Sequence, residues 1–234
     1  MIVEIIFGII ALLIFAPFII GTVLLARFVV NKSRPTQATT NLFQQYAATN
    51  NYPYTPKVDK QFVVGDILSA GSLLVQVGNY TQISTTNASI SLLTLGFMGQ
   101  RVGSADADGG RLVNEPVSLT VVQIQTPKKF SPVFLAPPYF SQFPLVPSQY
   151  TEQDVAELEG VEFGAAFKCF TKVKDVSIQE LLPPNIMVQL IDNFKSIAVE
   201  FKGQSVIFYQ PATINSASEL QSLITKTLAL VAKL

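Results

Sequence analysis

The feature that most constrains this chain is the run from Ile5 to Ala26, which reads IIFGIIALLIFAPFIIGTVLLA and holds no charged side chain. A helix rises about 1.5 Å per residue, so this run covers about 33 Å, enough to cross a hydrocarbon core of about 30 Å. Inside a bilayer the backbone must satisfy its own hydrogen bonds, as a helix does. The run therefore predicts one N-terminal transmembrane helix within an anchor of residues 1–30.

Two alternatives to an uncleaved anchor fit the run less well. A cleaved signal peptide has a basic start and an apolar region of about 7–15 residues, followed by a small-residue cleavage site. Here the start holds no basic side chain, the run is longer, and no A-x-A sequence follows it closely. A buried core helix fits less well because the apolar character runs all round this segment, without a break, over a full bilayer length.

Basic residues close to the run predict its orientation. Arg27, Lys32 and Arg34 follow it, whereas Glu4 is the one charged side chain before it. Basic residues beside a span stay on the cytoplasmic side, so we expect the N-terminus outside and the soluble part in the cytoplasm. The three cations are the predicted membrane-interface residues, each contributing about 1 kcal/mol near an anionic surface. Stop-transfer charges are the plainer reading of the same trio.

The composition of the remaining chain narrows the function. It has no His and one Cys, Cys169, so it can form no intramolecular disulfide, as expected in a reducing compartment. Without the three anchor cations and Glu4, thirteen basic and fifteen acidic residues remain, which disfavours binding to duplex nucleic acid. Absence of His removes the commonest general base and metal ligand. We expect no cofactor and no bound metal.

The sequence pattern over residues 31–135 predicts a linker followed by strands. Residues 31–61 are interpreted as a juxtamembrane linker with a short helix over 41–46 that Asn41 caps. Residues 62–135 form a strand-rich subdomain, and its apolar, β-branched patterns predict strands over 72–80, 90–97, 117–125 and 132–135. The alternation slips at Val122, which is compatible with a β-bulge.

The sequence pattern over residues 136–234 predicts helices interspersed with strands. Residues 136–150 are a Pro/aromatic arm, and residues 151–234 an α+β subdomain. The patterns predict a helix over 151–158, a strand over 163–173, a helix over 177–194, a hairpin turning at Lys202-Gly203-Gln204, and a helix from Ser216 to the end. This order favours an α+β fold with a mixed or antiparallel sheet and a C-terminal helix, following the single transmembrane helix. The sequence leaves open whether residues 62–135 and 151–234 form one domain or two.

The stretch from Leu158 to Gln210 resembles an uncharacterised family of bacterial membrane-anchored proteins, a domain of unknown function. The matching pieces are Leu158-Glu159-Gly160, Phe163, Phe167, Phe170, Val173, Leu181-Leu182-Pro183, Met187, Leu190, Ile197-Ala198-Val199 and Val206-Ile207-Phe208-Tyr209. The resemblance implies N-terminal spanning helices, usually two rather than the one found here, and a soluble domain ordered as strand, helix and hairpin. It implies no activity. Genes of the family often neighbour that of a LemA-type coiled-coil membrane protein, which the resemblance suggests as a partner.

No group of candidate residues matches a known motif for catalysis or metal binding. Cys169 lies in an apolar run without a His to activate it. Asp106 and Asp108 resemble the start of a calcium loop, but Arg111 and Val117 occupy the positions that need Gly and Glu. The remaining option is a surface site in which Asp106, Asp108 and Glu115 bind a cation weakly. The acidic group of Glu157, Glu159 and Glu162 is interpreted as solvated, and the pairs Lys128/Lys129 and Lys172/Lys174 as basic patches near lipid.

These observations predict a single-pass, membrane-anchored, non-enzymatic protein whose soluble domain binds a protein partner or assembly at the membrane. The alternative is a lipid- or small-ligand-binding module beside the bilayer, which a deep pocket lined with Phe near the membrane-facing end would favour. An enzyme using carboxylates or Lys is the third hypothesis, and it needs a cluster of ionisable groups with perturbed pKa values.

Overall fold

The computed structural model describes residues 36–69, 73–85, 88–102, 112–141, 146–147, 149–153, 161–172, 178–211 and 214–234, together with 15–17 and 20. Within these ranges no helix has both the length and the apolar character needed to span a bilayer. Apart from those four N-terminal residues, the predicted anchor lies outside the described residues, as do Arg27, Lys32 and Arg34.

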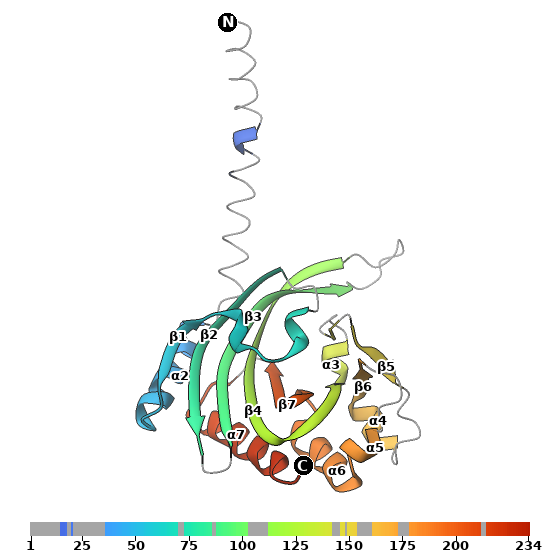
Figure 1. The fold of residues 1–234 in the computed structure, drawn as a ribbon. Helices are drawn as coiled ribbons and strands as arrows, with labels where there is room; N and C mark the ends of the chain where they lie inside the picture. The colour runs from blue at the N-terminus through green and yellow to red at the C-terminus, as the bar shows by residue number, and fades with distance from the viewer. Residues whose placement is uncertain are drawn as a thin grey trace, which may run out of the picture.

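One strongly curved sheet organises the domain (Figure 1). Its seven strands are β1 Tyr54–Val58, β2 Leu73–Ser84, β3 Ser89–Val102, β4 Leu112–Ala136, β5 Thr151–Gln153, β6 Lys168–Thr171 and β7 Ala198–Pro211. They follow the order β1-β2-β3-β4-β6-β5, with β7 paired to β4, and every pairing is antiparallel. Strands from residues 62–135 and 151–234 thus share one sheet. The α+β fold with an antiparallel sheet and a C-terminal helix is confirmed.

The predicted strands over 72–80, 90–97 and 117–125 are confirmed as parts of β2, β3 and β4. The predicted short strand over 132–135 belongs to β4, which is one strand of 25 residues. The slip at Val122 is not a bulge, since β3 and β4 keep one register from Ser89↔Gln125 to Val102↔Leu112. Val121 and Val122 are both apolar because both faces of the sheet are covered.

Helices and 3₁₀ turns connect these strands. They are α2 Gln37–Thr49, η1 Lys60–Phe62, η2 Asp66–Ser69, α3 Pro138–Ser141, α4 Val161–Ala166, α5 Ile178–Leu181, α6 Pro184–Phe194 and α7 Ala217–Val231. The predicted cap at Asn41 is wrong, because α2 begins earlier and Thr36 accepts a hydrogen bond from the Thr39 amide. The predicted start of the last helix is confirmed, since Ser216 accepts from the Glu219 amide.

Three local predictions in the C-terminal part are wrong. Residues 151–153 form β5 rather than the start of a helix, because they pair with β6. The strand predicted over 163–173 is wrong in its first part, because residues 163–166 belong to α4, and residues 168–171 extend as β6. The predicted hairpin is one strand, β7, bent at Gly203, where φ is +57°. Both of its arms pair with β4 instead of with each other, and the register shifts around Phe130.

The curved sheet separates two cores. On the convex face, side chains such as Leu92, Val122 and Phe208 pack with α2, α6 and α7. On the concave face, Leu93 and Tyr209 belong to an inner core that also contains residues of the segments around η2, α3 and Tyr150. Figure 1 shows α6 and α7 outside the bend of β4, with η2 and α3 inside it. The inner core therefore brings together segments that are far apart in the sequence.

Candidate functional site

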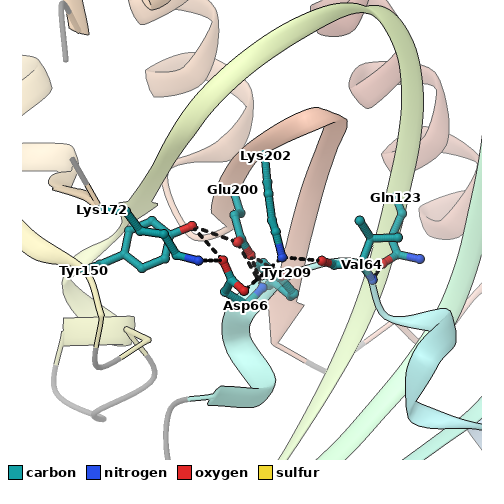
Figure 2. A network of polar contacts seen from close by, with 8 residues as sticks. All are labelled: Val64, Asp66, Gln123, Tyr150, Lys172, Glu200, Lys202 and Tyr209. Atoms are coloured by element: carbon teal, nitrogen blue, oxygen red, sulfur yellow. Dashed lines mark hydrogen bonds and ion pairs between the residues drawn. The ribbon is translucent and has the colours of Figure 1, made fainter.

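A buried carboxylate lies at the centre of the inner core. Glu200, on β7, is 0% exposed, and its two carboxylate oxygens receive three donors (Figure 2). The Tyr209 hydroxyl donates to Oε2 at 2.6 Å, the Tyr150 hydroxyl lies 3.1 Å from Oε1, and the Asp66 amide donates to both oxygens at 3.0 and 3.1 Å. This set of contacts satisfies a carboxylate that has no access to water.

Asp66 links Glu200 to two cations. Its Oδ1 lies 2.9 Å from Lys202 Nζ and its Oδ2 lies 2.5 Å from Lys172 Nζ. The Tyr150 hydroxyl, which has one hydrogen to donate, lies 3.2 Å from Asp66 Oδ2 as well as close to Glu200. Two carboxylates thus stand against two ammonium groups. We call Asp66, Tyr150, Lys172, Glu200, Lys202 and Tyr209 the polar cluster.

The bend of β7 creates this cluster. Glu200 lies on one arm of the strand and Tyr209 on the other, and the bend at Gly203 turns both toward the concave face. Asp66 comes from η2, Tyr150 immediately precedes β5, and Lys172 immediately follows β6. The cluster therefore ties four distant parts of the chain together.

The cluster also positions a short surface segment, residues 62–66, which we call the strap. Gln123 on β4 holds it in two places, because its side-chain amide donates to the Phe62 carbonyl at 2.8 Å and its oxygen accepts from the Val64 amide at 2.7 Å. Lys202 donates to the Val64 carbonyl at 3.0 Å. With the Asp66 amide on Glu200, side chains of the sheet fix the strap backbone at both ends.

The strap displays apolar side chains outward. Phe62 is 39% exposed and Val64 is 37% exposed, whereas Val63 between them is buried in the inner core. The Phe62 ring packs edge-on against Tyr80 of β2, with ring centroids 5.0 Å apart. The strap therefore presents two apolar side chains from a backbone that the sheet holds in place.

Burial controls the protonation of the cluster. It raises the pKa of Glu200 and, together with the neighbouring carboxylates, the pKa of Tyr150 and Tyr209, so both hydroxyls remain donors. Burial alone would also raise the pKa of Asp66, but the hydrogen bonds and charges of Lys172 and Lys202 outweigh it and lower that pKa below 3.8. Geometry and charge both describe a closed, internally satisfied network.

We expect Asp66→Asn to lower the free energy of unfolding by about 1.5–3 kcal/mol at pH 7, because it removes charge-assisted hydrogen bonds to two partly buried lysines. A lowered folded-state pKa stabilises the protein above the unfolded-state value and loses that effect as the pH falls through the folded value. The difference in free energy of unfolding between the wild type and Asp66→Asn should therefore shrink below about pH 3.8. Urea unfolding in detergent at pH 7 and pH 3 measures it, and a difference that is equal at both pH values would contradict the ion pairs.

A second candidate site is an apolar pocket of about 510 Å³. It lies between the residues that join β2 to β3, residues 125–130 of β4 and the C-terminal end of α7. Its apolar lining comes from Ala88, Pro127, Phe130, Leu228, Val231, Ala232 and Leu234. Lys128 lies at this site, and its Nζ donates to the Leu234 main-chain oxygen at 2.6 Å.

The residues singled out in the sequence have different positions. Cys169 is buried, and burial raises the pKa of its thiol to about 12, as expected for a structural cysteine. Lys172 belongs to the polar cluster rather than to a lipid-facing patch, and Lys128 lines the pocket. Glu162 is exposed on α4. Asp106, Asp108, Glu157, Glu159 and Lys174 lie outside the described residues, among which no group of three potential metal ligands occurs.

Sequence reasoning missed the polar cluster and the strap. One signal was available, since Glu200 interrupts the apolar strand Ile197-Ala198-Val199-Glu200-Phe201. A charged residue inside a buried strand requires partners, because an unpaired buried charge is very costly. No local pattern points to Asp66, Gln123 or Tyr150, whose roles depend on the curvature of the sheet.

Comparison with known proteins shows a likeness of fold. No protein-family model matches the chain, and no curated protein matches it in sequence. A solved structure, the crystal structure of the mycobacterial trehalose monomycolate transport factor A, TtfA, aligns with a TM-score of 0.50 at 9% sequence identity. The alignment covers 84% of this chain and 92% of that chain. At this identity the likeness concerns the fold alone.

Proposed function

We propose that this is a single-pass, membrane-anchored, non-enzymatic protein whose folded domain binds a partner protein at the cytoplasmic face of the membrane. The observation that carries the proposal is the strap. Its backbone is held by Gln123, Glu200 and Lys202, while Phe62 and Val64 point outward. Apolar side chains on an immobilised backbone bind at a lower entropic cost than the same side chains on a free loop.

The closed polar cluster supports binding rather than catalysis. Its carboxylate oxygens are engaged by Tyr hydroxyls, Lys ammonium groups and the Asp66 amide. A substrate of the buried Glu200 would have to displace these contacts, and each lost hydrogen bond leaves a polar group unpaired. The cluster is therefore better suited to holding the strap than to transferring protons.

The sequence supplies the membrane part of the proposal. Ile5 to Ala26 is long and apolar enough for one span, and Arg27, Lys32 and Arg34 favour a cytoplasmic domain. The resemblance of residues 158–210 to membrane-anchored bacterial proteins agrees with this, and it makes a LemA-type protein one candidate partner. The fold likeness to a protein named as a transport factor is compatible with a binding role.

Site-specific crosslinking in intact cells tests the proposal. A photoreactive p-benzoylphenylalanine at the exposed Lys60, beside the strap, should form an adduct with one discrete protein. Replacing Phe62 and Val64 with Ser should reduce that adduct at least tenfold, because the apolar contact is lost while the backbone of the strap remains held.

Val188→Ser is the matched control, because Val188 is 56% exposed on α6 and lies outside the strap. It should leave the adduct unchanged. Absence of a protein adduct, or an adduct indifferent to Phe62 and Val64, would refute binding through the strap. As a control for orientation, a cysteine at Gln37 should resist a membrane-impermeant thiol reagent in intact cells.

The apolar pocket favours a second function, a lipid- or small-ligand-binding module. Its volume of about 510 Å³ lies within the range of about 300–1,000 Å³ typical of small-molecule sites. Its lining includes a single Phe, Phe130, and is otherwise mostly aliphatic. We retain this function as an alternative to partner binding by the strap.

A further inference from the structure

We propose that the apolar pocket binds one alkyl chain that carries an anionic head group, with the head group at Lys128. This inference rests on the second function above and names its ligand class. The pocket is separate from the strap and from the polar cluster, since it shares no residue with either.

The lining of the pocket is mostly apolar, and Gln125 supplies its one side-chain amide. The Thr85 hydroxyl donates to the Ala88 carbonyl at 2.9 Å, and the Thr126 hydroxyl donates to the Lys128 carbonyl at 2.9 Å. Both hydroxyl hydrogens are thus used within the protein, and the aliphatic side chains of α7 form the opposite wall. A ligand rich in hydroxyl groups would find few hydrogen-bond partners there. An alkyl chain makes no hydrogen bonds in water and so loses none by entering.

Charge at the pocket points to an anionic head group. Among the lining residues, Lys128 is the one with a charged side chain, and its Nζ stands 5.6 Å from the centroid of the Phe130 ring. Its ammonium group has three donors, one of which is used by the Leu234 oxygen. A carboxylate or phosphate can therefore share Lys128 while its chain lies along Phe130 and Leu228.

Photolabelling of the full chain in native membranes tests this inference. The probes are a C16 fatty acid with a diazirine on its chain and the matched C16 alcohol. Trypsin releases Thr227–Lys233, which contains the lining residues Leu228, Val231 and Ala232, and we expect the fatty acid to label it. Unlabelled octanoate, decanoate and dodecanoate should compete, with potency rising about fourfold per methylene at equal aqueous concentration.

Two Ala→Trp variants in the same peptide provide the comparison. Ala232 lines the pocket, so Ala232→Trp should reduce labelling at least tenfold. Ala229 is exposed on α7 and is not a lining residue, so Ala229→Trp should label like wild type. Both changes alter the peptide mass equally. Lys128→Gln should reduce labelling by the acid and leave labelling by the alcohol unchanged.

The outcomes separate the inference from the functions it accompanies. Equal labelling of wild type and Ala232→Trp, or no competition by dodecanoate, would overturn the pocket as the site. Labelling confined to residues 1–27 would overturn it too, while leaving membrane anchoring intact. Labelling of Thr227–Lys233 by the alcohol alone would overturn the anionic ligand class and leave apolar-ligand binding standing. The strap experiment is independent of all these results.

Discussion

Replacing Glu200 with alanine should lower the free energy of unfolding by about 3–5 kcal/mol. The change leaves the Tyr209 hydroxyl, the Tyr150 hydroxyl and the Asp66 amide without their shared acceptor. Tyr209 is fully buried, so its hydroxyl loses its acceptor out of contact with bulk water. Because native domains are stable by only about 5–15 kcal/mol, this loss is a large fraction of the total.

Urea unfolding of the detergent-solubilised chain measures the effect. Glu180→Ala is the matched control, because Glu180 is exposed on α5, and it should change stability by no more than about 0.5 kcal/mol. Glu200→Gln should fall between the two, since it keeps one acceptor oxygen. If Glu200→Ala proved as stable as Glu180→Ala, the polar cluster would not be what holds the inner core together.

Gly65→Ala should destabilise the protein by about 1–3 kcal/mol or more, through overpacking of the inner core. The strap backbone passes directly over the polar cluster at Gly65. A Cβ there would overlap the Tyr209 hydroxyl and lie 2.7 Å from Glu200 Oε2. Neither group has room to move, so the hydrogen bond between Tyr209 and Glu200 must break or the strap must lift.

Gly164→Ala provides a control of opposite sign. Gly164 is exposed within α4, where alanine is a better helix former by about 0.5–1 kcal/mol. Thermal unfolding should therefore show a lower Tm for Gly65→Ala and an unchanged or higher Tm for Gly164→Ala. If the strap is the docking surface, Gly65→Ala should also reduce crosslinking from Lys60. If Gly65→Ala had the same Tm as the wild type, the strap would lie further from the cluster than the structure places it.

Local patterns predicted those features that depend on neighbours in the chain. Ser216 and Glu219 predicted the start of α7, because a cap and its amide lie within one turn. Apolar, β-branched runs predicted parts of β2, β3 and β4. The hairpin prediction at Gly203 was wrong for the same local reason: the sequence shows where the backbone turns but not which strand each arm will pair with.

The sequence by itself therefore determined an apolar run of bilayer length, its flanking charges and most of the strands, since each is a property of adjacent residues. Tertiary structure alone decided the candidate site. Asp66, Tyr150, Lys172 and Glu200 are separated by up to 134 residues and meet only because β4 and β7 curve together around the inner core. Short-range patterns predict such strands, but the curvature that joins these side chains arises from packing on both faces of the sheet.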